Sequence, residues 1–183
     1  DEAFSVLWRV DGSPDKLLVE PVDNIGMSLD LLSPPATDVR DMVIAMAPGG
    51  DLAVAWESGT DVFMRGIKSP KALTTSFVLH TVNNGTQESP SLALGDGGRA
   101  VVAFLGPSGN GGSDVFVRIF PDFATNQAPA EQNISMHPPG FANPPTVALH
   151  PSGNFLVAWG DPGGALIYRR FAADGTAAAP VTT

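Results

Sequence analysis

Three arginines recur at one position of a repeated segment, and they are the first candidates for chemistry. They are Arg65 in DVFMR, Arg118 in DVFVRIF and Arg169 in ALIYRRF. Three guanidinium groups that met at one point would bind an anion such as a carboxylate. If each arginine belongs to a separate repeat, however, the three are spread around the molecule. We therefore expect each to pair with an Asp or Glu of a neighbouring repeat.

Two aspartates begin the same segments, Asp61 and Asp114, each four residues before its arginine. In an extended strand that spacing is ~13 Å, so no ion pair can form within the strand. An enzyme of the hydrolase or lyase class could use such Asp and Arg side chains. We keep that class as an alternative and predict no enzymatic activity and no catalytic residues.

The candidate metal ligands are Asp11, Ser13 and Asp15, whose oxygens alternate along one turn. Calcium prefers oxygen ligands in such an arrangement. The turn has fewer carboxylates than calcium loops use, and Pro14 stiffens it. We interpret the segment as an ordinary turn, keep calcium as an alternative and predict no cofactor.

Two loop elaborations supply the candidate binding residues. The stretch 106–113 is longer than its counterparts and contains Asn110, and the Pro-rich stretch 136–144 contains His137 and Phe141. Insertions in repeat proteins gather on one face and often carry binding. The alternative interpretation is loop variation without a function.

A recurring sequence motif identifies the elements that must position these residues: FSVLW, LAVAW, AVVAF and FLVAW. We call it the VAW phrase. Its closing aromatics stand at intervals of roughly 50 residues, which indicates a repeat protein. They are Trp8, Trp56, Phe104 and Trp159. Tryptophans can stack on sugars, but a phenylalanine fills the same position and the phrase is apolar. We therefore predict that these aromatics form core between repeats, each contributing about 2–3 kcal/mol.

Each repeat contains four short β-strand signals. Two apolar runs joined by Gly, Pro, Asp or Ser predict a hairpin, and a third and a fainter fourth run follow. Four strands in ~40–50 residues are typical of a β-propeller blade. The sequence thus predicts an all-β, propeller-like array of four-stranded antiparallel blades in one domain, 1–183. The units are 1–40 (incomplete), 41–89, 90–143 and 144–183, and a β-sandwich is the alternative fold.

Apolar residues on both faces of the third strands, as in DVFVRIF, indicate that each sheet is covered on both sides. The first unit lacks its first strand, so the array has about four blades and is partial. Exposed strand edges are templates for pairing. We expect a second copy or another protein to complete them, or the chain to be a fragment of a larger propeller.

The segments PTVALHPSGNFLVAWGD and ALIYRRFAADGT resemble the blade repeats of secreted bacterial propellers. They are similar to NHL-type repeats and to the Asp/Gly-turn repeats of RTX-like proteins. The resemblance implies that the Pro-initiated strand lines a central channel, the VAW strand is second and the VFxR strand third. It implies no activity, because the shared residues are turn and core positions. The Ser-x-Asp-x-Gly-x-x-Trp box of sialidases is not matched.

Composition narrows the function classes. The net charge of −9 disfavours nucleic acid and anionic membrane surfaces, and no apolar stretch approaches the length of a membrane span. The chain has no cysteine, which fits an exported bacterial protein that is secreted, periplasmic or on the cell surface. We expect a non-enzymatic binding or scaffold module that makes protein–protein contacts through its loops. The alternatives are a lectin-like propeller that binds carbohydrate and a fragment of a hydrolase or lyase.

Overall fold

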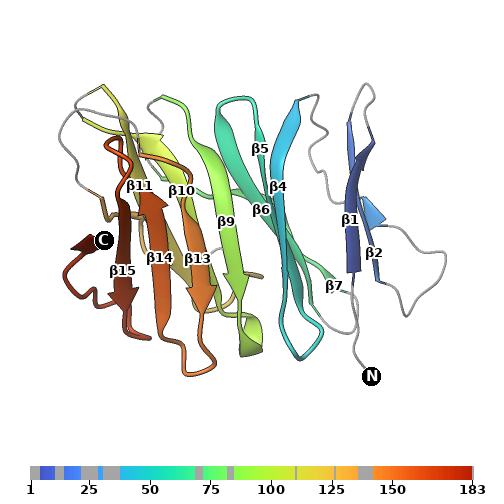
Figure 1. The fold of residues 1–183 in the computed structure, drawn as a ribbon. Helices are drawn as coiled ribbons and strands as arrows, with labels where there is room; N and C mark the ends of the chain where they lie inside the picture. The colour runs from blue at the N-terminus through green and yellow to red at the C-terminus, as the bar shows by residue number, and fades with distance from the viewer. Residues whose placement is uncertain are drawn as a thin grey trace.

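A computed structural model describes residues 5–10, 15–21, 29–30, 38–68, 72–81, 85–109, 111–125, 127–135 and 142–182. Its strands form four antiparallel sheets, each made of strands that follow one another in the chain. The sheets stand side by side, and the fold is the predicted all-β, propeller-like array (Figure 1). Within this part of the chain, no helix is long and apolar enough to cross a membrane.

The strands have the following bounds. The first sheet contains β1 (Ser5–Val10), β2 (Lys16–Pro21) and β3 (Leu29–Asp30). The second contains β4 (Val39–Met46), β5 (Leu52–Ser58), β6 (Asp61–Lys68), β7 (Ala72–Leu73) and β8 (Phe77–Val78). The third contains β9 (Glu88–Leu94), β10 (Ala100–Pro107), β11 (Ser113–Phe120) and β12 (Gln132–Asn133). The fourth contains β13 (Thr146–Leu149), β14 (Phe155–Gly160), β15 (Leu166–Phe171) and β16 (Val181–Thr182).

The second, third and fourth sheets share one strand order. The VAW strand (β5, β10 or β14) lies between its preceding hairpin partner and the VFxR strand (β6, β11 or β15). The first hairpin turns tightly at a glycine, such as Gly50 and Gly153, both of which have φ 86°. Such a backbone favours glycine because a Cβ clashes in the left-handed region. The limits of the repeat units stay a prediction.

Neighbouring sheets bury their apolar faces against each other. Phe104 of the third sheet lies in one cluster with Ala53, Ala55 and Met64 of the second. Trp159 of the fourth sheet lies in the next cluster with Val101, Ala103 and Val117 of the third, among others. The closing aromatic of the third and of the fourth sheet therefore packs on the preceding sheet.

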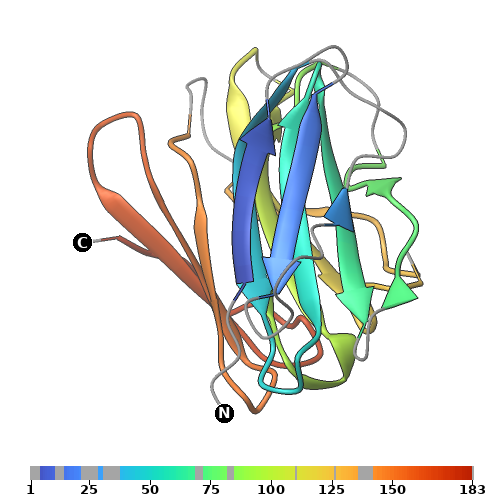
Figure 2. The same ribbon diagram turned by 90° about the vertical axis from the view of Figure 1, so that its right-hand side faces the viewer.

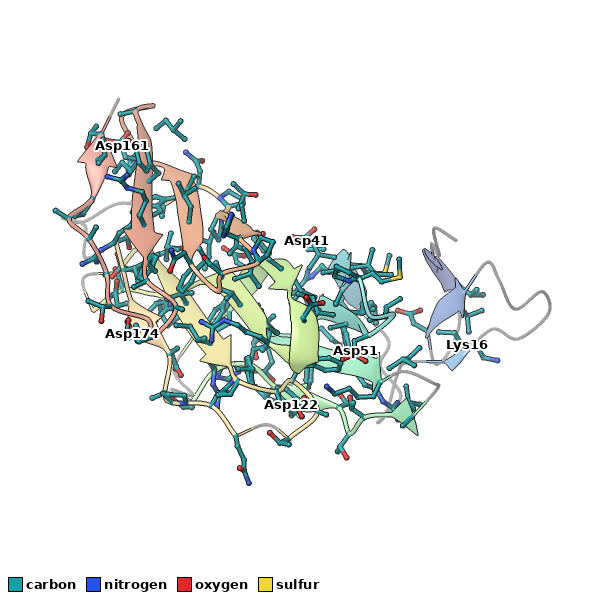
Figure 3. The ribbon with its side chains drawn as sticks, turned by 90° about the horizontal axis from the view of Figure 1, so that it is seen from below. Lys16, Asp41, Asp51, Asp122, Asp161 and Asp174 are labelled. Atoms are coloured by element: carbon teal, nitrogen blue, oxygen red, sulfur yellow. The ribbon has the colours of Figure 1, made fainter. Side chains whose placement is uncertain are left out.

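The four sheets follow an open arc. Seen from below, the first sheet lies at one end and the fourth at the other (Figure 3). Figure 2 views the array from the end where β1 and β2 are nearest, with the fourth sheet standing apart on the left. β5 and β10, in the middle of the array, are buried on both faces.

Candidate functional site

The three recurring arginines bind main-chain carbonyl oxygens. Each donates from Nε to a residue of the connection after its own strand: Arg65 to Thr74 (2.7 Å), Arg118 to Pro129 (3.1 Å) and Arg169 to Ala178 (2.8 Å). We expected carboxylate partners in these places. Carbonyls replace them because the fourth strands are short, so the chain beside them has main-chain acceptors to satisfy. The arginines do not converge on a common ligand.

Two of these arginines also link one sheet to the sheet before it. The Arg118 Nη1 donates to the Leu79 carbonyl at 2.8 Å, and the Arg169 Nη1 donates to the Ile134 carbonyl at 3.2 Å. Burial lowers the pKa of Arg118, against the opposing charge of Glu131. Because arginine keeps its charge throughout the physiological range, Arg118 is a cation held between two sheets by carbonyl oxygens.

The aspartates at the start of the third strands contact the end of the segment that follows each of these strands, 72–81 in the second sheet and 127–135 in the third. We call this the fourth segment. The Asp61 Oδ1 lies 3.0 Å from the His80 Nε2. Asp114, at the same position of the next sheet, accepts hydrogen bonds from Asn133 Nδ2 at 2.7 Å and Ser135 Oγ at 3.0 Å. The second sheet therefore carries an imidazole where the third carries a hydroxyl group.

These histidine and serine positions are equivalent by main-chain pairing. The residue before His80 is Leu79, whose N–H donates to the Val62 carbonyl at 2.7 Å. The residue before Ser135 is Ile134, whose N–H donates to the Val115 carbonyl at 2.9 Å. The contact between aspartate and fourth segment is thus a repeated structural feature whose chemistry changes from one sheet to the next.

Two hollows meet at His80, at the end of the array where β5 turns into β6 (the upper end in Figure 1). We call them together the His80 cleft. The larger hollow, of about 710 Å³, is lined by His80 with Thr60, Asp61, Val78, Thr81, Gly85 and Thr86. The smaller, of about 90 Å³, is lined by His80 with Gln87, Phe104, Gly106, Pro107, Phe116 and Glu131. The cleft is therefore built from the second and third sheets together.

One wall of the His80 cleft is aromatic. The rings of Phe104 and Phe116 stack with centroids 5.9 Å apart and an interplanar angle of 16°. Gly106 permits this arrangement, because a Cβ there would come within 3.0 Å of the Phe116 ring. Phe116, which is partly exposed, consequently offers apolar surface beside the polar groups around His80, whereas Phe104 is buried behind it.

Glu131 ties the third sheet to the second beside the cleft. Both of its carboxylate oxygens accept a hydrogen bond from the Thr81 N–H at 2.9 Å, and the Thr81 hydroxyl donates to Oε2. His80 is therefore held between Asp61 on one side and a fixed Thr81 on the other. Its side chain is 3% exposed, whereas that of Asp61 is 40% exposed.

Lys68 links the second and third sheets at the end of their junction opposite to the His80 cleft. Its Nζ lies 3.1 Å from Asp51 Oδ2 and 3.2 Å from Asp122 Oδ1, and it lies over the Phe123 ring. Burial lowers the pKa of Lys68, but hydrogen bonds to the two carboxylates outweigh it and hold the pKa above its usual value. This ammonium group is a link between sheets and lies outside the cleft.

A buried carboxyl, Glu57, lies at the end of β5 and forms an ion pair with Arg40 Nε at 2.7 Å. Burial raises the pKa of Glu57, against the hydrogen bond from the Ser89 N–H and the charge of Arg40.

Figure 3 shows that the labelled aspartates are spread over the array. Among residues 5–182 as far as the structure describes them, no three His, Asp or Glu residues form a metal-binding group.

The aromatic repeat positions are buried. The exposed fractions are 2% for Trp56, 1% for Phe104 and 2% for Trp159, so these rings are core and offer no face for stacking a sugar. The side chain of Trp8 lies outside the described part of the structure.

The other predicted site residues fall mostly outside the described residues. That is so for the binding candidates Phe141, His137 and Asn110 and for the calcium candidates Asp11 and Ser13. Asp15 is described: it is buried, and its Oδ2 accepts a hydrogen bond from the Val39 N–H at 3.3 Å. Asp15 thus joins the first sheet to the second.

Sequence reasoning missed the His80 cleft. His80 has no other histidine and no carboxylate at a metal-ligand spacing in the sequence, so it belongs to no recognisable motif. A usable signal did exist, since an apolar residue followed by a polar one ends the fourth segment in both Leu79-His80 and Ile134-Ser135. Aligning these pairs with Asp61 and Asp114 would have placed an imidazole beside a carboxylate.

Comparisons with known proteins support the fold through similarity to solved structures. No family model matches the chain, and no curated protein matches it. Among solved structures it is similar to an Aleuria aurantia lectin mutant, N224Q, in complex with alpha-methyl-L-fucoside. The TM-score is 0.57 and the identity 12%, over 99% of this chain and 60% of that chain. It is also similar to the Hadza microbial sialidase Hz136, with a TM-score of 0.51 and 10% identity over 92% of this chain and 50% of that chain.

Both likenesses are too distant in sequence to show more than a β-propeller-like fold. The chain spans about 60% of the length of the lectin and half the length of the sialidase. One of these proteins is a lectin and the other an enzyme, so the fold is shared by binding and by catalysis.

Proposed function

We propose that the protein is a non-enzymatic binding module that holds a neutral sugar in the His80 cleft. The observation that carries this proposal is the meeting of a carboxylate, an imidazole and three threonine hydroxyls with an aromatic wall at one junction of two sheets. Ligand sites combine apolar walls with a few placed polar groups, and they occur between structural units.

The polar groups match the hydroxyls of a sugar, which both donate and accept hydrogen bonds. The exposed oxygens of Asp61 accept, and the hydroxyls of Thr60 and Thr86 do both. The C–H face of a sugar ring needs an apolar surface, which Phe116 and Pro107 provide. A volume of about 710 Å³ in the larger hollow is within the range of small-molecule sites.

The charge of the cleft favours a neutral ligand. Its described lining contains the carboxylates Asp61 and Glu131 and neither Lys nor Arg. The whole chain carries a net charge of −9, which would repel an acidic sugar further. The arginines that could have neutralised such a ligand are bound to main-chain carbonyls.

The likeness to a lectin solved with alpha-methyl-L-fucoside supports carbohydrate as the ligand class. The likeness to a sialidase favours an enzyme, but each of the three recurring arginines here donates a hydrogen bond to a main-chain carbonyl. Asp114 is likewise bound to Asn133 and Ser135. We therefore prefer binding to hydrolysis.

In keeping with the resemblance of its repeats to secreted bacterial propellers, we propose that the module acts outside the cytoplasm of a bacterium.

The test is a titration of the 183-residue chain with neutral monosaccharides, fucose and galactose among them, and with sialic acid as the anionic comparison. We expect a neutral sugar to bind, sialic acid not to bind, and His80→Ser to weaken binding about tenfold or more, which is ~1.4 kcal/mol. Asp114→Asn is the matched control, because it alters the equivalent contact in the next sheet. Equal binding by wild type and His80→Ser, or binding of none of the sugars, would refute the proposal.

A further inference from the structure

A pocket of about 210 Å³ lies at the end of the array opposite to the His80 cleft, where the first hairpins turn (the lower end in Figure 1). Its lining includes Pro48 of the second sheet, residues 94–96 and Arg99 of the third, and residues 149–151 and Gly153 of the fourth. We call it the Arg99 pocket. It is built from three consecutive sheets and shares no residue with the His80 cleft.

Arg99 is a partly buried cation that forms no ion pair with the other described residues. Its Nη2 donates to the Ala173 carbonyl at 2.5 Å and to the Gly153 carbonyl at 3.5 Å. Its buried Nε has no hydrogen-bond partner in the described part of the chain. The link to the fourth sheet therefore leaves the positive charge without a counter-charge. Such a charge is costly when it is removed from water, and a bound anion would offset the cost.

The repeat itself does not explain a cation at this place. Arg99 stands five residues before the closing aromatic of its VAW phrase, and the same position is Asp51 in the second sheet and Asn154 in the fourth. Asp51 has an ion-pair partner, since its Oδ2 lies 3.1 Å from the Lys68 Nζ. The unpaired guanidinium group is thus particular to the third sheet, where it lines a pocket.

Asp96 supplies the opposite charge on the same lining. It is exposed and begins the short 3-10 helix η1 (Asp96–Gly98), which joins β9 to β10. Within the described residues no ion pair joins Asp96 to Arg99, although both line the pocket. A molecule that satisfies both groups must carry a carboxylate for Arg99 and a cationic group for Asp96.

His150 adds a hydrogen-bond donor to the pocket. The Ser152 N–H donates to the His150 Nδ1 at 3.1 Å. Because Nδ1 accepts this hydrogen bond, the neutral ring carries its proton on Nε2. The Nε2–H group can donate to a carboxylate oxygen, which strengthens the preference for an anionic group near Arg99.

The remaining walls of the Arg99 pocket are apolar. Leu94 and Leu149 are partly buried, and Pro48 and Pro151 also line the pocket. Gly95 lies close against this wall, because a Cβ there would come within 3.0 Å of the Leu149 Cδ2. The volume of about 210 Å³ is below the ~300–1,000 Å³ of sites for drug-sized ligands. The pocket therefore suits a small molecule with an apolar part.

We propose that the Arg99 pocket binds a free amino acid with an apolar side chain, such as leucine. The carboxylate of the amino acid pairs with Arg99 and accepts a hydrogen bond from His150. Its ammonium group pairs with Asp96, and its side chain packs against Leu94 and Leu149. The proposal does not depend on the sugar site, because the two lie at opposite ends of the strands.

Calorimetric titration of the 183-residue chain with three related compounds tests the ligand class. Leucine carries both charges, isocaproate lacks the ammonium group and isoamylamine lacks the carboxylate. We expect leucine to bind, and isoamylamine to bind about tenfold or more weakly because it leaves Arg99 unpaired. Isocaproate should also bind more weakly than leucine, since Asp96 repels it. No binding of leucine, or equal binding of leucine and isoamylamine, would overturn the proposal.

Two variants test the residues. Arg99→Met should weaken leucine binding about tenfold or more. Asp96→Asn does not depend on a buried contact, because Asp96 is exposed. It should weaken leucine binding about threefold, as expected for an exposed ion pair, and should not weaken isocaproate binding. Asp38→Asn is the matched control, because Asp38 is exposed and precedes β4 at the end away from the pocket. Equal weakening of leucine and isocaproate by Asp96→Asn, or equal effects of Asp96→Asn and Asp38→Asn on leucine, would refute the assignment.

Discussion

The junction between the second and third sheets and the junction between the third and fourth use the same structural parts. Each has an aromatic packed on the preceding sheet, Phe104 or Trp159, and an arginine bound to a carbonyl of that sheet, Arg118 or Arg169. Among the polar contacts that differ, one occupies equivalent positions in the two sheets. The second sheet joins Asp61 to His80, and the third joins Asp114 to Asn133 and Ser135.

Comparing the two junctions distinguishes contacts that serve stability from contacts that are candidates for function. What both junctions share is explained by stability alone, because repeats conserve the contacts that hold neighbouring units together. What only one junction has is a candidate for function. The His80 cleft, with its imidazole and aromatic wall, belongs to the junction between the second and third sheets.

The largest effect is expected from the shared aromatic position. Phe104→Ala should reduce the free energy of unfolding by about 3–5 kcal/mol, because it opens a cavity in the cluster between the second and third sheets. Phe104→Leu, which keeps most of the apolar volume, should cost clearly less. Denaturant unfolding followed by circular dichroism measures both. A loss below about 1 kcal/mol for the alanine variant would mean that the sheets do not depend on each other.

The arginines should show a smaller, graded effect. Arg118 is 6% exposed and binds the carbonyls of Leu79 and Pro129, whereas Arg169 is only partly buried. Arg118→Met should therefore reduce the free energy of unfolding by about 2–3 kcal/mol and Arg169→Met by about 1 kcal/mol, since buried carbonyls lose their donor. The same unfolding experiment compares them. The reverse order would contradict the difference in burial between the two junctions.

The smallest effect is a pH dependence at Glu57. Burial raises its folded-state pKa above the usual 4.5, so its contribution to stability is greatest below that pH and is lost as the pH rises through the raised pKa. The free energy of unfolding of the wild type, relative to Glu57→Gln, should thus fall from acidic to neutral pH. Unfolding curves for both proteins at several pH values measure this. A difference that rises with pH would show that the ion pair with Arg40 outweighs burial.

The sequence predicts the strands well and their polar partners poorly. The VAW phrase and its glycine turns mark the hairpins, because alternation and turn residues act over a few positions. The carbonyl partners of Arg65, Arg118 and Arg169 could not be predicted, since they depend on where each short fourth strand ends. His80 and Asp61 are brought together by the same segment, whose position is set by a main-chain bond from Leu79 to Val62 and by no periodic pattern.

The most direct test of the account is a two-dimensional NMR titration of the ¹⁵N-labelled chain with the tightest-binding neutral sugar. The account predicts that the backbone signals of His80, Thr81 and Thr86 shift with increasing sugar, while those of Asp114 and Ser135 stay in place. At a given sugar concentration the shifts of Thr81 and Thr86 should be smaller in His80→Ser, which binds about tenfold or more weakly, and unchanged in Asp114→Asn. Shifts centred on Asp114 and Ser135, or shifts at Thr81 and Thr86 that the serine substitution leaves unchanged, would contradict it.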